Sequence, residues 1–425
     1  MKVLVIGGGW SGISSAISAK KAGADVHIFE KTDLLLGLGN IGGIMRNNGR
    51  FTASEELIEL GAGELIDICD KNSRHKGISF PGHEHASLYD VTSIESDVRN
   101  LLLSMGINIY LMTRVTDIKQ VNNRISGIYL SNGDYIAGDV IIEATGSTGP
   151  MGNCQRYGNG CAMCILRCPS YGPRISISER AGVKDFSGER DDYKLGAFSG
   201  SCEIAKDSLS EELKDKLEKC GVAILKVPSE DINYGKLEAK VCQQYALKEF
   251  AENVILLDTG HVKLMTTYYP LEKLRKIPGL EKARYIDPLA GSIGNSIRYL
   301  SVAPRDNQMR VSGVDNLLCA GEKSGLFVGH TEAIATGSLA GHNSVRLSMG
   351  IPLLTLPASL CIGDIISYAN EKSKTREGRK TRYTFAGSDY FNRMKSLNLY
   401  TVDIQEIKNR VKKVNLDGIF NQALV

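Results

Sequence analysis

Four closely spaced cysteines carry the most distinctive chemistry of this sequence. Cys154, Cys161, Cys164 and Cys168 stand within the stretch NCQRYGNGCAMCILRCPSYG. The spacing Cys161-x2-Cys164-x3-Cys168-Pro169 is typical of ferredoxins, and Cys154 offers a fourth thiolate. Thiolates this close, in a stretch interrupted by glycine and proline, can converge on one soft metal centre. We therefore predict an iron–sulfur cluster, [4Fe-4S], at these four residues.

Three other interpretations of the cysteines stay open. They could bind zinc, Cys161 and Cys164 could form a redox dithiol, or the four could be buried thiols without a chemical role. The ten cysteines of the chain are expected to be thiols, redox groups or metal ligands rather than disulfides. Without a cluster, Cys161 or Cys164 is the predicted catalytic thiolate.

Glycines at the start of the chain indicate a second kind of chemistry, the binding of a dinucleotide. The apolar run from Lys2 to Ile6 reads as a buried strand and leads into Gly7, Gly9 and Gly12, with the spacing G-x-G-x-x-G. Gly7 permits a tight turn, Gly9 leaves room for a pyrophosphate, and Gly12 lets the next helix approach the sheet. That helix, expected from about Ser11 to Ala22, directs its free N–H groups at the phosphates.

An acidic residue follows at the expected distance. The second strand, Asp25 to Phe29, ends at Glu30, where a ribose hydroxyl needs an acceptor. An acid at this position favours FAD or NAD over NADP. The alternative is a glycine-rich turn that binds no ligand.

Two later segments are expected to complete the nucleotide-binding domain. The strand Val140 to Glu143 runs into the small residues Ala144, Thr145 and Gly146, which permit a second close approach to a cofactor. Near the end of the chain, a strand from Leu317 to Ala320 precedes a glycine-rich loop and a helix from Thr331 to Met349. The N-terminus of that helix suits negative charge on a reduced flavin.

These elements predict an α/β fold with a Rossmann-like, glutathione-reductase-like FAD-binding domain. The domain is expected to combine residues 1–150 and 308–368, and an α+β substrate or cap domain, residues 151–307, is inserted between them. Residues 369–425 form a polar and basic helical tail. The basic stretch from Lys372 to Arg382 could contact phosphates, although a solvated loop is the interpretation we favour.

Composition limits the choice of partners. The net charge of +3 is too small to indicate a polyanion by itself, and no apolar run is long enough to span a membrane. We therefore expect a cytoplasmic protein without a membrane partner. Its partner is a small-molecule substrate or an electron-transfer protein, and a homodimer is one option.

The chain resembles the GidA/TrmFO family of FAD-dependent tRNA-modifying proteins. The resemblance is strongest in LRKIPGLEKARYIDP and in NLLCAGEKSGLFVGHTEAIATGSLAGHNSVRLSMG, and it is looser in GNIGGI and in PSYGPRISISERAGVKDFS. It extends in segments from Met1 to about Tyr368.

The resemblance implies the identity and the site of the cofactor. FAD is implied to bind at Gly7, Gly9, Gly12, Glu30, Lys31, Gly42, Gly43, Val115, Ala144, Thr145, Gly146, Gly321, Gly325, Gly329, Thr331 and Glu332. In such relatives the flavin supports methylation or aminomethylation of a tRNA uridine, with folate-derived carbon and reactive cysteines.

The sequence also departs from the family pattern. Gly39 and Asn40 stand where relatives carry a reactive cysteine before the Ile-Gly-Gly segment, and the cysteine cluster is foreign to these enzymes. We therefore favour an FAD-dependent oxidoreductase with an iron–sulfur cluster beside the flavin. The alternatives are a tRNA uridine-modifying enzyme, with tRNA as its partner, and a flavin-binding protein without catalytic activity.

Overall fold

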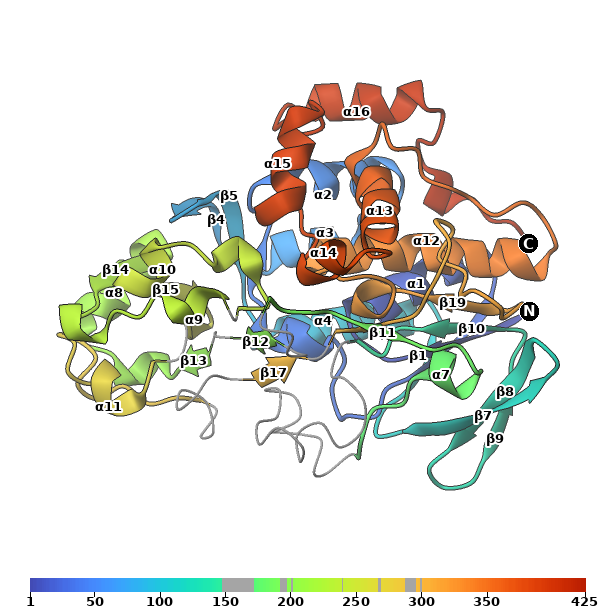
Figure 1. Ribbon diagram of the computed structural model, residues 1–425, viewed down its shortest axis with the longest axis horizontal. Coiled ribbons are helices and arrows are strands. Elements are labelled where there is room, and N and C mark those ends of the chain that lie inside the picture. Colours follow the sequence, from blue (N-terminus) through green and yellow to red (C-terminus); the bar gives the residue numbers. More distant parts are fainter. Residues whose placement is uncertain are drawn as a thin grey trace.

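A computed structural model describes residues 1–146, 172–191, 197–199, 202–238, 240–266, 269–286, 296–298 and 300–425. Its centre is a parallel sheet of five strands in the order β19-β10-β1-β2-β6 (Figure 1). These strands span β1 Lys2–Ile6, β2 Asp25–Phe29, β6 Asn108–Tyr110, β10 Val140–Glu143 and β19 Leu317–Cys319. The sheet confirms the predicted α/β, Rossmann-like fold class. Because β19 pairs with β10, the two ends of the chain share one sheet.

Two helices from opposite ends of the chain pack closely beside this sheet. Helix α1 (Trp10–Lys21) lies against α12 (His330–Ser348). A Cβ added at Gly337 would lie 1.9 Å from Ser14 Oγ, so only glycine permits this approach. The hydroxyl of Ser18 also donates to the carbonyl of Ser338 at 2.8 Å. This packing fixes the N-termini of both helices relative to the glycine turn.

Smaller elements surround the parallel sheet. Strands β7 (Val115–Val121), β8 (Arg124–Leu130) and β9 (Tyr135–Ala137) form an antiparallel sheet, and Asn316, just before β19, holds it through bonds to both backbone groups of Ile125. Three helices lie between β2 and β6 in the chain: α2 Gly49–Glu59, α3 Glu64–Lys71 and α4 Ile94–Ser104.

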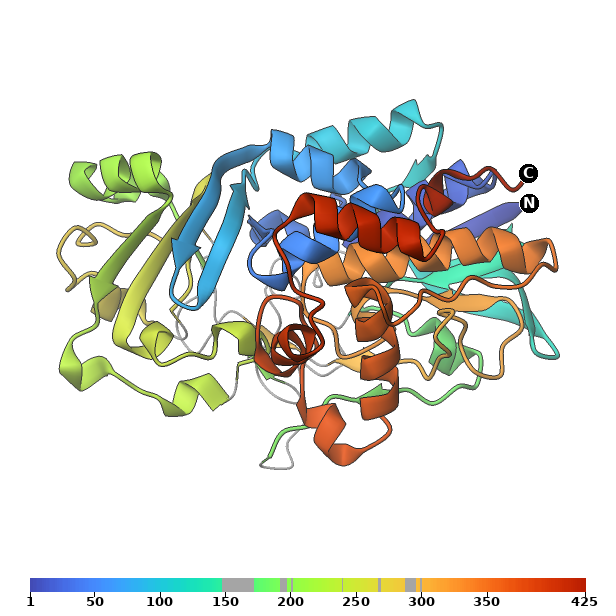
Figure 2. The same cartoon turned by 90° about the horizontal axis from the view of Figure 1, so that it is seen from above.

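A second unit lies at the opposite end of the long axis from the two termini (Figure 2). It contains an antiparallel sheet in the order β13-β16-β15-β14, and helix α8 packs against it. Their bounds are β13 Cys202–Ile204, α8 Glu211–Cys220, β14 Val222–Lys226, β15 Asn253–Thr259 and β16 His261–Leu264. A third antiparallel sheet joins this unit to the first: β3 Ile44–Met45, β5 His83–Tyr89 and β4 Ser73–Phe80. Apolar side chains of β5 and β15 share one buried cluster.

The C-terminal segment packs against α2. It forms α13 Cys361–Lys372, α14 Arg376–Lys380, α15 Ser388–Ser396 and α16 Ile404–Lys413. The interpretation of the basic stretch as a solvated loop is wrong, because it is helical in part and paired with carboxylates. Arg379 bonds Glu189 at 2.7 Å, and Lys380 lies 2.6 Å from Asp191. The neighbouring Phe385 is fully buried.

The remaining α-helices and strands of the described residues are short: α7 Ile177–Arg180, β11 Phe186–Ser187, β12 Ala197–Ser199, α9 Gly235–Glu238, α10 Glu249–Glu252, α11 Leu271–Leu274, β17 Ser296–Arg298 and β18 Ser301–Val302. None of the helices in the described ranges has both the length and the apolar character needed to span a bilayer.

Candidate cofactor and substrate site

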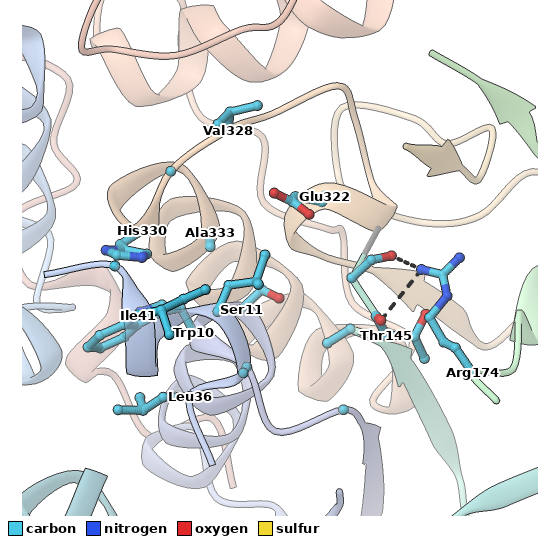
Figure 3. Close-up of a pocket in the computed structure, with 18 of the residues that line it drawn as sticks. Trp10, Ser11, Leu36, Ile41, Thr145, Arg174, Glu322, Val328, His330 and Ala333 are labelled. Carbon is cyan, nitrogen blue, oxygen red and sulfur yellow. Dashed lines mark hydrogen bonds between the residues drawn. The ribbon is translucent and has the colours of Figure 1, made fainter. Parts of the chain in front are cut away.

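A cavity of about 280 Å³ lies at the carboxyl ends of β1 and β10, where open parallel sheets bind their ligands. The glycine turn and the first turn of α12 contribute to its wall (Figure 3). The second unit contributes residues from the segment 240–245 and from β16. The cavity therefore joins the nucleotide-binding fold to the second unit.

The three glycines of the opening turn have different physical roles. Gly7 has a φ of +108°, and its Cβ would lie 2.3 Å from the carbonyl oxygen of Ala144. A Cβ at Gly12 would lie 1.9 Å from the carbonyl oxygen of Gly7. Both are thus required by protein packing. A Cβ at Gly9 would meet its nearest protein atom, the oxygen of Leu36, only at 4.0 Å. Because Gly9 lines the cavity, the space beside it is available to a ligand.

Glu30 lies at the end of β2, lines the cavity and is buried. One carboxylate oxygen accepts from the amide of Gly8 at 2.8 Å. The other accepts from the amide and the hydroxyl of Thr32 at 2.8 and 2.9 Å. These bonds hold the carboxylate in place, and the four lone pairs of a carboxylate leave capacity for a further donor such as a ribose hydroxyl.

Most of the other predicted cofactor residues also line the cavity. They are Lys31, Gly42, Val115, Ala144, Thr145, Gly146 and Gly329. The ammonium of Lys31 additionally donates to the carbonyl of Gly172 at 3.0 Å.

Six predicted residues do not line this cavity, namely Gly12, Gly43, Gly321, Gly325, Thr331 and Glu332. A Cβ at Gly43, Gly321 or Gly325 would collide with a side chain of the protein itself, so these glycines serve packing. Glu332 faces Arg50, whose Nε lies 3.2 Å from both carboxylate oxygens. It also accepts from the hydroxyl of Thr384 at 2.8 Å. This buried pair positions the start of α12.

Sequence reasoning missed two aromatic side chains on the cavity wall, Trp10 and His330, and the Tyr89 ring next to them. The rings of Trp10 and His330 lie 5.5 Å apart, and Tyr89 lies 6.1 Å from Trp10 and 5.9 Å from His330. Gly42 fits beneath them, because its Cβ would lie 2.0 Å from the His330 ring. Figure 3 shows Trp10 and His330 on the same side of the cavity. The sequence held one signal for this feature, because Trp10 stands between Gly9 and Gly12 of the glycine fingerprint.

Arg174 was also missed, although it lies in the segment GPRIS that carries the resemblance. It donates to the carbonyls of Thr145 and Gly146, as Figure 3 shows. The bonds tie the second small-residue turn to the chain that follows the cysteine-rich stretch. Arg174 thereby brings a positive charge to the cavity wall.

The predicted metal and catalytic cysteines, Cys154, Cys161, Cys164 and Cys168, lie outside the described residues. Within the described ranges, no group of three or more His, Cys, Asp or Glu residues could hold a metal ion. Of the cysteines that the structure describes, only Cys242 lines the cavity, and it is half-buried.

Lys240 lies two residues before Cys242 and also lines the cavity. Its ammonium donates to the carbonyl of Met265 at 3.1 Å and lies 5.2 Å from the centre of the Phe250 ring. Burial lowers the pKa of Lys240 to about 8, and the nearby Cys242 opposes part of this shift. A thiol beside a cation is an arrangement that suits nucleophilic chemistry.

The parallel sheet, the ligand space beside Gly9 and the acid at the end of β2 define a dinucleotide-binding protein of the flavoprotein class. The sequence profile of the family described as glucose inhibited division protein A matches residues 2–245 and 236–352. The chain therefore belongs to the GidA family, which confirms the resemblance.

Curated relatives match shorter parts of the chain. A methylenetetrahydrofolate–tRNA-(uracil-5-)-methyltransferase TrmFO from Microcystis aeruginosa is 26% identical over 228 residues, which is 50% of this chain and 47% of that protein. A tRNA uridine 5-carboxymethylaminomethyl modification enzyme MnmG from Chlorobaculum tepidum is 40% identical over 85 residues, 20% of this chain and 13% of that protein. The chain thus spans less than half the length of these relatives.

The fold is similar to that of Aquifex aeolicus GidA. The TM-score is 0.62 with 16% identity, and the match covers 97% of this chain and 76% of the other. Family and fold together support FAD as the cofactor and confirm the class of FAD-dependent enzymes.

The same comparisons correct our favoured function. The interpretation of the chain as an oxidoreductase built around an iron–sulfur cluster is wrong, because the family and the curated tRNA-modifying relatives agree with the alternative interpretation instead. The spacing of the cysteines resembles a local motif of ferredoxins, and such a motif alone does not establish a cluster.

Proposed function

We propose that this protein is an FAD-dependent enzyme that modifies a uridine base of tRNA. One observation carries the proposal: a single cavity is lined by the glycine turn of a nucleotide-binding fold and by a cysteine from the second unit. The names of the relatives supply the substrate, because they act on a uracil or a uridine of tRNA.

The residues of the cavity fit FAD in the following way. Gly7, Gly9 and the N-terminus of α1 bind the diphosphate, and Glu30 accepts a bond from the ribose. The backbone at Val115 would hold the adenine. The start of α12, which lines the cavity, would hold the flavin, and its dipole would favour negative charge there. When bound, FAD supplies the two-electron chemistry of the reaction.

The second unit supplies the substrate side of the cavity. Residues 1–150 and 308–368 hold the cofactor in this proposal, and residues 151–307 contain the groups that face the base. Cys242 is the nucleophile, and Lys240, two residues before it, lines the same cavity. Lys240 is buried and Cys242 is half-buried, so the cavity wall shields the ammonium from bulk water more than it shields the thiol.

The test is a reaction with an unmodified tRNA transcript. The FAD-loaded protein is incubated with the transcript, a reductant and methylenetetrahydrofolate, and the nucleosides are then analysed by mass spectrometry. We expect 5-methyluridine, formed only in the presence of the folate, and its loss in Cys242→Ala. Unchanged nucleosides with this one-carbon donor, both alone and together with glycine as the amine of a carboxymethylaminomethyl group, would refute the proposal. That result would leave a flavin-binding protein without catalytic activity as the interpretation.

A further inference from the structure

Gln243 and Gln244, two neighbouring residues of the segment 240–245, differ in the hydrogen bonding of their side-chain amides. The amide of Gln243 is satisfied by the protein: it donates to the carbonyl of Lys380 at 3.0 Å and accepts from the amide of Arg382 at 2.8 Å. Gln244 also lines the cavity, but the residue is only 3% exposed, and its Oε1 has no hydrogen-bond partner among the described residues. A buried polar atom without a partner is costly, so this amide is prepared for a ligand.

The backbone of Gln244 is held firmly. The ring of His83 donates from Nε2 to the Gln244 carbonyl at 3.1 Å, and its Nδ1 lies 2.9 Å from the Asn47 amide nitrogen. Burial lowers the pKa of His83 to about 3, so the ring is neutral and has one proton to donate. Gly387 packs against the stem of Gln244, because its Cβ would lie 2.7 Å from Gln244 Cβ. In the part of the chain that the structure describes, the amide oxygen of Gln244 is thus left without a hydrogen-bond donor.

Lys240 lines the same cavity and has N–H donors to spare. Its ammonium has three N–H bonds, and its one hydrogen bond among the described residues goes to the Met265 carbonyl. In these residues no carboxylate forms an ion pair with it, and the rings of Phe250 and Tyr245 lie 5.2 and 5.8 Å away. The remaining donors can serve an oxygen acceptor of a ligand.

We propose that Gln244 and Lys240 form the subsite that recognises the imide edge of the target uracil. Uracil presents an N3–H donor between two carbonyl acceptors. A glutamine amide matches this edge, because its oxygen accepts from N3–H while its nitrogen donates to a neighbouring carbonyl. This inference rests on the proposed function and identifies what selects the base.

The two residues have different tasks in this selection. An amide alone could also pair with cytosine after a rotation that exchanges its oxygen and nitrogen. Lys240 removes this ambiguity, because an ammonium only donates. It pairs with a uracil carbonyl and opposes the amino group that cytosine presents at the same place.

The test compares three mononucleotides as probes of the full chain loaded with FAD. Binding of uridine, cytidine and N3-methyluridine 5′-monophosphate is followed through the visible spectrum of the flavin. We expect uridine monophosphate to bind at least about tenfold more tightly than the other two nucleotides, because each of those would lose the bidentate pair with the glutamine amide. Gln244→Leu should weaken uridine monophosphate by about the same factor and leave the FAD content unchanged, whereas Lys240→Met should restore binding of cytidine monophosphate.

The matched control is Gln405→Leu, on the exposed face of α16, which should bind all three probes as the native protein does. If Gln244→Leu fails to retain FAD, Gln244→Glu replaces it, because this variant keeps an acceptor and loses the donor. Equal binding of uridine and N3-methyluridine monophosphate, no binding of uridine monophosphate, or an unchanged preference in the Gln244 variant overturns the subsite. The tRNA reaction is measured separately: uridine modification that does not depend on Gln244 refutes only this subsite, whereas base selection without modification refutes only the proposed reaction.

Discussion

Replacing Lys240 with methionine should stabilise the folded protein at neutral pH. Methionine fills a similar space and carries no charge, and the lysine is buried without a carboxylate partner among the described residues. Burial lowers the pKa of Lys240 from 10.5 to about 8. At about 1.4 kcal/mol for each pKa unit, the buried charge costs about 3 kcal/mol. Loss of the hydrogen bond to the Met265 carbonyl destabilises the variant by about 1 kcal/mol. The net increase in the free energy of unfolding is therefore about 2 kcal/mol.

The effect has a defined dependence on pH. The pKa of Lys240 is lower in the folded protein than in the unfolded chain. The destabilisation that its buried charge causes is therefore fully present below pH 8. It decreases as the pH rises from about 8 to 10.5, since the folded protein then loses the proton first. The advantage of Lys240→Met should therefore be large at pH 7 and small near pH 10.

Urea unfolding at the two pH values measures this difference. Native protein, Lys240→Met and the control Lys412→Met, which changes an exposed lysine of α16, are compared at one fixed FAD concentration. The control should change the free energy of unfolding by less than about 0.5 kcal/mol. A Lys240→Met protein that is less stable than the native one at pH 7, or a difference that is independent of pH, would refute the reasoning.

Three further variants test the packing around the site. Gly12→Ala should destabilise the protein by several kcal/mol in urea, because its Cβ would lie 1.9 Å from a backbone oxygen; native-like stability would contradict the close packing. Arg50→Met should lower the free energy of unfolding by about 3 to 5 kcal/mol, because it leaves Glu332 buried and unpaired. Adding Glu332→Gln should recover part of this loss. A double variant without any recovery would argue against the ion pair. Burial opposes ionisation of Asp258, but the hydrogen bond from His75 and two nearby cations outweigh it and lower its pKa. Asp258→Asn should lower the free energy of unfolding by its largest amount above pH 4, and this difference should disappear as the pH falls further. A difference that persists in acid would show that the carboxylate charge is not its cause.

Local rules made the nucleotide-binding half of the fold predictable. A buried strand, a glycine turn, a helix and an acid at the end of the next strand follow one another within 30 residues, so sequence order places them together. The roles of Gly7 and Gly12 in packing also followed from the motif, and the structure shows the contacts that a side chain would break.

The part of the cavity wall that the second unit contributes could not be predicted in the same way. Cys242 lies in the ordinary stretch KVCQQY, and it reaches the cavity only because the second unit folds back against the first. The resemblance implied Glu332 as a cofactor residue, and it gave no sign that Arg50, 282 positions away in the chain, bonds the Glu332 carboxylate. The basic tail looked solvated because the carboxylates that pair with it, such as Glu189, are distant in the sequence.

Binding of FAD to Gly9→Val tests the central claim most directly. Gly9 has a φ of −75°, which valine tolerates. Apart from its chain neighbours, the nearest atom of the described residues would lie 4.0 Å from a Cβ there, so the fold should keep its stability. If the space beside Gly9 holds the diphosphate, titration of the FAD-free native protein should reach one FAD per chain, and the variant should bind FAD at least about 100-fold more weakly. A folded Gly9→Val protein that binds FAD as tightly as the native one would contradict the account.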